Sequence, residues 1–115
     1  MLSTTRDYLI SKSFSDIYMG SMPSLDNCIG LFSTAGHNPN VSFDGNISEQ
    51  RGLQVVVRNK SYPTGETIIN NIYKLLVKEM TLSVAYIAQQ SPFSIGKNEN
   101  GNSEFSVNFI CLKEG

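Results

Sequence analysis

The stretch that decides the fold is residues 84–112, VAYIAQQSPFSIGKNENGNSEFSVNFICL. Its second half alternates strictly between apolar and polar side chains. One face carries Phe105, Val107, Phe109 and Cys111, and the other carries Glu104, Ser106 and Asn108. A period of two is typical of a strand with one buried face. Residues 84–89 are also extended in character. The stretch therefore predicts two antiparallel strands.

A long polar segment joins these two strands. It contains Pro92, Gly96 and the pair Asn100–Gly101, which favours a tight reversal with positive φ. Long connections without structure of their own are uncommon in compact domains, and those that occur are often functional. We therefore expect residues 91–102 to form a loop that contacts a partner. Its candidate contact residues are Phe93, Lys97 and Glu99.

Three strands are predicted upstream. Residues 16–19 form a short strand, and residues 27–34, which are apolar on both sides, predict a strand in the middle of a sheet covered by helices. Residues 53–59 alternate, with Leu53, Val55 and Val57 inward and Gln54 and Arg58 outward.

A segment rich in Gly, Asn and Pro separates the second and third of these strands. Residues 35–50 predict either an extended loop or a small protruding hairpin that turns at Asp44–Gly45. We expect this segment to contact a partner as well, with His37, Asn38 and Phe43 as candidates.

An amphipathic helix follows the third strand, capped by Ser61 or Thr64 with Pro63 in its first turn. Its apolar stripe comprises Ile68, Ile69, Ile72, Leu75 and Leu76, widened by Tyr73, Val77 and Met80. Each buried aliphatic side chain contributes about 1.5–3 kcal/mol, so this helix is the largest single contributor to the core. A second, short helix is predicted over residues 2–12, capped by Ser3 or Thr4, with Leu2, Leu9 and Phe14 inward.

The elements follow in the order α-β-β-β-α-β-β within one domain, residues 1–115. Strands in hairpins with helices on one face give an α+β fold. We expect a mostly antiparallel sheet of about five strands covered by two helices.

Composition and charge argue against direct DNA binding and against a membrane span. Nine Lys and Arg residues against ten Asp and Glu residues leave a net charge of −1, and the bases are scattered along the chain. Non-specific binding to nucleic acid comes from basic surface, so direct DNA binding is not expected. No apolar run approaches the ~18 residues of a membrane span. Cys28 and Cys111 are expected to be buried free thiols in a reducing cytoplasm, and a bridge between them is the minor alternative.

Groups that perform chemistry are sparse. His37 is the only histidine, and no nucleophile motif, phosphate-binding loop or Cys/His metal spacing occurs, so we expect no catalytic residue, cofactor or metal. A remote alternative is a metal-dependent nuclease that uses Asp44 and Glu49 beside Arg51. Tyr62 and Phe93 are candidate interface anchors, although Phe93 can equally fold back over the end of the core.

Three blocks resemble the tail terminator family of long-tailed double-stranded DNA phages, often labelled minor capsid protein. They are residues 23–36 (PSLDNCIGLFSTAG), 53–62 (LQVVVRNKSY) and, most specifically, 89–109 (QQSPFSIGKNENGNSEFSVNF). In that family the position of Lys97 is commonly Arg and that of Asn98 commonly Asp, and the N-terminal helix is usually longer.

The resemblance implies a non-enzymatic virion protein. It implies a hexameric ring that caps the last ring of tail tube protein, stops tube growth and joins the tail to the head connector or stopper protein. Genomic DNA would pass through the ring without specific binding. The alternative from the same class is a head-completion or stopper protein on the connector.

Overall fold

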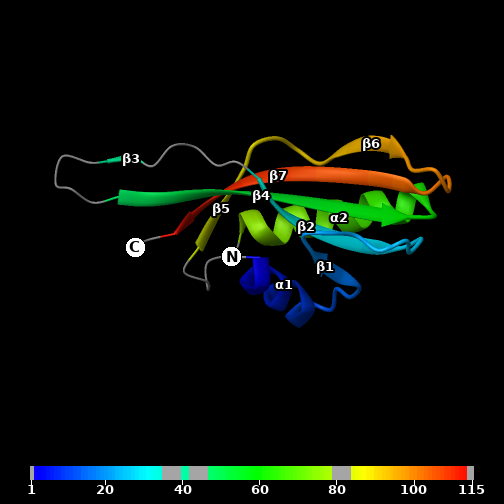
Figure 1. Cartoon of the computed structure of the whole chain (residues 1–115), viewed down its shortest axis with the longest axis horizontal. Coiled ribbons are helices and arrows are strands. Elements are labelled where there is room, and N and C mark those ends of the chain that lie inside the picture. The colour runs from blue at the N-terminus through cyan, green and yellow to red at the C-terminus, as the bar shows by residue number, and fades with distance from the viewer. Residues whose placement is uncertain (1, 35–39, 42–46, 79–83, 114–115) are drawn as a thin grey trace.

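The computed structural model describes residues 2–34, 40–41, 47–78 and 84–113. These residues form two helices and seven strands (Figure 1). In chain order they are α1 (Leu2–Ser11), β1 (Ile17–Met19), β2 (Cys28–Thr34), β3 (Asn40–Val41), β4 (Ile47–Asn59), α2 (Tyr62–Val77), β5 (Val84–Ala88), β6 (Phe93–Lys97) and β7 (Ser103–Lys113). The predicted α+β class is confirmed, and the predicted element order holds with β3 and β6 added.

The main sheet has the strand order β1-β2-β4-β7-β5. All neighbouring pairs are antiparallel except β1 and β2, which are parallel. Both β5 and β6 pair with β7, and β4 occupies the other side of β7 along its full length. Therefore β5 and β6 form one sheet edge that is interrupted at residues 89–92, and β1 forms the opposite edge.

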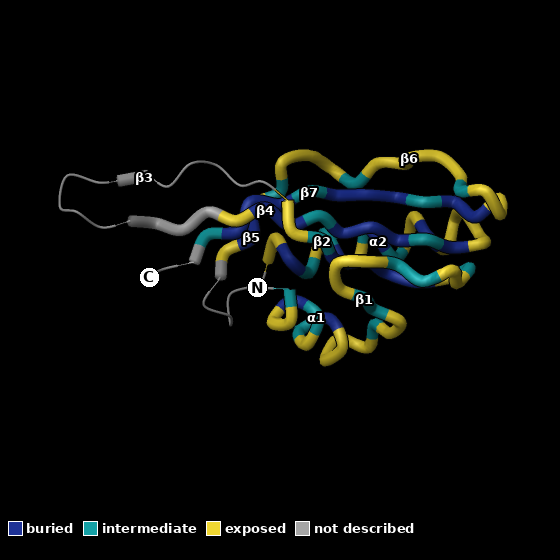
Figure 2. Tube along the Cα trace, viewed as in Figure 1, coloured by how far each residue is buried: buried dark blue, intermediate teal, exposed yellow. Residues whose placement is uncertain are grey.

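The core lies on one face of this sheet. It is built from the inward positions of β2, β4 and β7 and from Leu9, Ile69, Ile72, Leu76 and Tyr86. The helix α2 packs across β4, β7 and β5, while α1 lies beside β1 and β2 (Figure 1). Burial is greatest along β4 and β7 and lowest on β6 (Figure 2). The predicted inward positions Leu53, Val55 and Val57 are confirmed as buried.

The start of α2 follows the predicted chemistry. Ser61 is the N-cap, and its Oγ accepts a hydrogen bond from the Thr64 amide at 3.4 Å. Pro63 lies in the first turn, where its missing N–H is not needed. The predicted caps of the first helix are wrong: Ser3 and Thr4 lie inside α1, which already includes Leu2. No helix in the described part of the chain is long and apolar enough to cross a membrane.

The segment predicted as a loop over residues 91–102 is a hairpin instead. Its first half is β6, which pairs with β7, and only residues 98–102 form the turn. The predicted positive φ is present at Gly101 (φ 78°). The Asn98 side chain accepts hydrogen bonds from the amides of Asn100 (3.1 Å) and Asn102 (2.9 Å). A side chain that bonds the backbone two residues on is the usual device of such turns, so the polar run is a rigid reversal.

Upstream, β3 and β4 pair through Asn40↔Ser48 and Val41↔Ile47. This favours the hairpin over the extended loop for that segment. The predicted turn at Asp44–Gly45 lies outside the described residues. β4 is longer than predicted and begins at Ile47, so its first residues and β3 extend away from the helices at one end (Figure 1).

Candidate interaction surfaces

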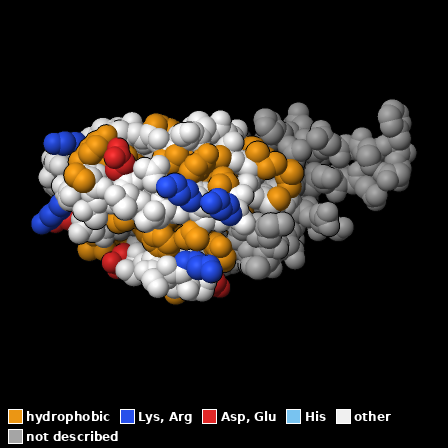
Figure 3. Space-filling model, turned by 180° about the vertical axis from the view of Figure 1, so that it is seen from behind, with side chains coloured by type: hydrophobic (Ala, Val, Ile, Leu, Met, Phe, Trp, Pro, Cys, Tyr) orange, Lys and Arg blue, Asp and Glu red, His pale blue; other side chains and the backbone are white. Residues whose placement is uncertain are grey.

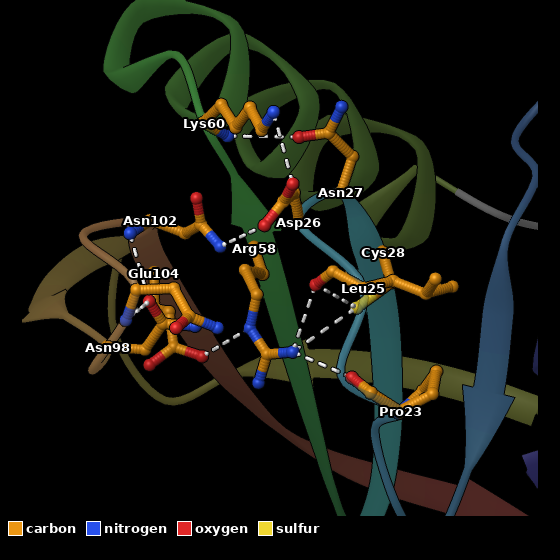
Figure 4. A network of polar contacts seen from close by, with 11 residues as sticks. Pro23, Leu25, Asp26, Asn27, Cys28, Arg58, Lys60, Asn98, Asn102 and Glu104 are labelled. Carbon is orange, nitrogen blue, oxygen red and sulfur yellow. Dashed lines mark hydrogen bonds and ion pairs between the residues drawn. The ribbon is translucent and has the colours of Figure 1, made fainter.

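A polar network ties together one end of the sheet (Figure 4). Arg58, near the end of β4, donates from Nε to Glu104 of β7 at 2.9 Å. Its Nη1 donates to the carbonyl oxygens of Pro23 at 2.8 Å and Leu25 at 3.2 Å. The side chains of Arg58 and Glu104 are only 14% and 19% exposed. Charge-assisted bonds in such a shielded place are stronger than those on an open surface, so Arg58 fixes the segment after β1 against the sheet.

Asp26 extends this network to the β6–β7 turn and to the start of α2. Its Oδ1 accepts from Asn102 Nδ2 at 2.9 Å, and its Oδ2 lies 3.1 Å from Lys60 Nζ. The hydrogen bond from Asn102 and then that from Lys60 lower the pKa of the Asp26 carboxyl below its usual value. The adjacent Asn27 accepts from the Lys60 amide at 2.9 Å. These contacts therefore fix the β1–β2 connection, the β6–β7 turn and the start of α2 relative to one another.

Three of the candidate contact residues lie at or beside this end. Lys97 closes β6, Glu99 lies in the turn after it, and both are exposed. Tyr62 begins α2 and is 47% exposed, with its ring packed edge-on against Phe105 at 4.9 Å between centroids. The structure thus brings residues from two separate segments to one end of the sheet.

Phe93 lies elsewhere, at the start of the edge strand β6 opposite Ser106. It is 40% exposed, so it does not close over the end of the core. The other candidates, His37, Asn38 and Phe43, lie outside the described residues. The strands next to them, β3 and the start of β4, lie at the end opposite Lys97 and Glu99 (Figure 1).

The sheet face turned away from the helices is largely uncharged. Its central positions include Gln54, Val56, Ser106 and Asn108, because these alternate with the core positions of β4 and β7. Gln54 Nε2 donates to Ser106 Oγ at 3.1 Å. The charges on this face that belong to the network, Arg58 and Glu104, neutralise each other.

Basic side chains are also dispersed on the opposite side of the molecule. Figure 3 shows Lys and Arg side chains scattered among hydrophobic and uncharged ones, without a continuous stripe. A dispersed arrangement is not the electrostatic footprint of a DNA-binding surface.

A groove of about 350 Å³ lies between the α1–β1 connection and the ends of β2 and β4, and its lining includes Phe14, Asp16, Cys28 and Ile68. Among the described residues no group of three or more His, Cys, Asp and Glu side chains gathers to hold a metal. The nuclease candidate Asp44 lies outside the described residues, as does the side chain of Glu49.

Both cysteines are free and buried. Cys28 lies opposite Arg58 in the register of β2 and β4, so its side chain is on the face away from the helices. Cys111 lies on the core face. β4 separates their strands, so the alternative of a bridge between them is wrong. Burial raises the pKa of Cys28 and raises that of Cys111 to about 12, so both remain protonated thiols near neutral pH.

Sequence reasoning missed two features of these surfaces. The first is the Arg58 network, whose partners are separated by up to 76 positions and leave no local pattern. The second is the exposed edge made by β5 and β6, where Ile87 and Ile95 are 50% and 49% exposed. For β6 the available signal was Ile95, a large aliphatic side chain between Ser94 and Gly96.

Comparison with known proteins gives one family. The family model described as "Bacteriophage tail terminator protein" matches residues 8–114. No curated protein matches the chain.

Proposed function

Because the chain belongs to the bacteriophage tail terminator protein family, we propose that it caps the tail tube as a ring of six copies. In this role it stops tube growth and offers the head connector or stopper protein a surface to bind. The observation that carries the proposal is the family match over residues 8–114, nearly the whole chain. Family membership gives a structural role in the phage tail; the ring, the subunit number and the connector contact are the proposal.

The two different ends of the sheet support a ring with two different faces. One end carries Tyr62, Lys97 and Glu99 on a rigid frame, and the other carries β3 and the start of β4 (Figure 1). Identical subunits that meet through unlike surfaces close into a ring whose two sides differ. One end would then meet the tail tube and the other the connector.

The uncharged face of the sheet supports a role in DNA passage. When sheets close into a ring, the helices that cover one face have more space on the outside. The helix-free face then points inward, as in barrels that are surrounded by helices. The inward surface would then present Gln54 and Asn108 together with the neutralised Arg58–Glu104 pair. Phosphate binding depends on unneutralised Lys and Arg. Genomic DNA would therefore pass through without specific binding.

Deletion of the gene for this protein from the infecting phage tests the proposal. If the protein terminates the tube, cells infected with the deletion phage contain tubes longer than normal, and expression of the wild-type protein in trans restores the normal length. Normal tails beside heads that leak DNA would instead show a stopper on the connector. Tubes of normal length joined to full heads would contradict both roles.

A matched pair of charge reversals tests the rigid end. Glu99 is exposed in the β6–β7 turn, and Glu66 is exposed on α2. Complementation with Glu99→Lys should lower the yield of joined particles, while Glu66→Lys should restore it fully. Equal yields from the two variants would exclude the Glu99 end from the contacts with tube and connector.

A further inference from the structure

Half of the exposed large hydrophobic side chains lie on the strands that form the two edges of the sheet. Eight large hydrophobic side chains are exposed among the described residues. Ile87, Phe93 and Ile95 lie on the edge made by β5 and β6. Met19 lies on β1, which forms the other edge. The other four lie elsewhere: Ile10 on α1, Leu25 in the β1–β2 connection, and Tyr62 and Val77 on α2.

The directions of the strands make the two edges complementary. β1 runs parallel to β2, and three antiparallel steps, through β4 and β7 to β6, make β6 run opposite to β1. A contact repeated from copy to copy about an axis along the strands preserves their directions. It would place β6 of one copy antiparallel to β1 of the next. Antiparallel pairing is slightly the more stable kind per residue.

The register places the two edges at the same height. Tyr18 of β1 pairs with Gly30, Gly30 with Val56, and Val56 with Ser106. Ser106 pairs in turn with Phe93 of β6. Tyr18 and Phe93 therefore lie in one row that crosses the whole sheet. Edge-to-edge contact in this row has no rise along the strands, so it closes a ring rather than a helical filament.

Charge complementarity supports the same alignment. In antiparallel pairing Gly96 comes opposite Asp16, the residue before β1, and Lys97, the end of β6, lies one position further along. Both residues are exposed, and within the described part of the chain neither takes part in an ion pair. Opposite charges across a contact fix its register and oppose wrong alignments.

We propose that neighbouring copies join edge to edge, with β6 of one copy beside β1 of the next, Phe93 opposite Tyr18 and Lys97 near Asp16. The occupant of each edge is a second copy of this chain, and the inference depends on the proposed ring. Six sheets, each five strands wide, would form a continuous wall about 45 Å across at the usual strand spacing of ~4.8 Å. Such a wall leaves room for a DNA duplex.

Disulfide trapping with the full chain tests the contact. The double variant Tyr18→Cys/Phe93→Cys, oxidised with diamide in the presence of tail tubes, should give a ladder of covalent multimers that ends at the closed ring. Directly opposed residues on antiparallel strands lie within the Cα separation that a disulfide spans. Each single variant should remain monomeric on a non-reducing gel, and a mixture of the two should stop at dimers. The wild-type protein, with its buried Cys28 and Cys111, is the control.

The outcomes separate this contact from the ring itself. Native mass spectrometry of the same samples reports whether rings form. Rings without a ladder in the double variant would overturn the edge contact and leave the proposed function standing. Covalent dimers from either single variant would show contact between identical edges, which also overturns the inference. Absence of both rings and ladder would count against the contact and the proposed ring together.

The charge pair gives an independent test with milder substitutions. Asp16 has a positive φ of 56°, which Asn tolerates well, so Asp16→Asn removes the charge without straining the backbone. Lys97→Gln removes the partner charge. Each single variant should weaken ring formation, and the double variant should be no weaker than either single one. Effects that add in the double variant would show that the two residues do not meet.

Discussion

Arg58 and Glu104 form an ion pair across β4 and β7, with Nε and Oε2 2.9 Å apart and both side chains largely shielded from solvent. The same guanidinium holds the carbonyl oxygens of Pro23 and Leu25. One side chain therefore fixes the segment after β1 against the centre of the sheet.

Removing this side chain should destabilise the protein. Hydrogen bonds to charged groups contribute about 1.5–3 kcal/mol each, and Glu104 would lose its partner in a shielded site. Arg58→Met keeps much of the aliphatic stem, so we expect a loss of about 2–4 kcal/mol in the free energy of unfolding, measured by urea denaturation. Arg6→Met is the matched control, because Arg6 pairs with Asp7 on an exposed surface and such pairs contribute about 0–1 kcal/mol. Equal losses from the two variants would show that shielding does not strengthen the Arg58 contacts.

Replacing Asn102 should raise the pKa of Asp26. The hydrogen bond from Asn102 is the first cause of the lowered pKa, and Lys60 follows. A carboxyl with a lowered folded-state pKa stabilises the protein above its unfolded pKa, and this contribution is lost as the pH falls through the folded value. In Asn102→Ala the pKa of Asp26 should move back toward 3.8, as measured by NMR titration of its carboxyl carbon. An unchanged pKa would show that Lys60 alone holds the carboxylate.

Gly52 should tolerate a methyl group less well than Gly30. A Cβ at Gly52 would clash with Thr34 Oγ1 and lie 2.8 Å from the backbone oxygen of Thr34, which cannot move aside. At Gly30 the nearest atoms belong to the side chains of Met22 and Phe32, which can shift. Overpacking costs about 1–3 kcal/mol, so we expect that loss for Gly52→Ala and a smaller one for Gly30→Ala in the same urea denaturation. The reverse order would mean that β2 and β4 separate easily at Thr34.

The thiols should be unreactive in the folded protein. Burial raises the pKa of Cys111 to about 12 and also raises that of Cys28, and only the thiolate attacks a disulfide reagent. At pH 8 the native protein should react with Ellman's reagent much more slowly than the protein in 6 M guanidinium, which should react rapidly at both cysteines. Rapid reaction of one thiol in the native protein would show that its strand opens. The same measurement on the Cys28→Ala and Cys111→Ala variants would identify the thiol that reacts.

Most of the core could be predicted from local patterns. The alternation at Phe105, Val107 and Phe109 and the aliphatic stripe of α2 each repeat with a regular period, so they identify a strand and a helix without reference to the rest of the chain. The strand face and the centre of the helix stripe, Ile69, Ile72 and Leu76, are buried as predicted. The prediction was wrong for Val77, which is exposed, and Ile68, Tyr73 and Leu75 are only half-buried.

The edge strand β6 could not be predicted in the same way. All five of its residues are exposed, so burial imposes no alternation, and Pro92 and Gly96 are typical of loops. Its strand conformation comes from pairing with β7, which is a tertiary effect. The Arg58 network is equally non-local, because it joins residues from the β1–β2 connection, β4 and β7. The surfaces proposed for assembly thus depend on features that only the folded chain reveals.

Cryo-electron microscopy of purified phage tails tests the proposed ring directly. We expect a ring of six copies of this chain at the end of the tube that faces the head, with its helices outside and its uncharged sheet face toward the channel. A tube end that lacks this chain, or copies attached singly without contact between neighbours, would contradict it.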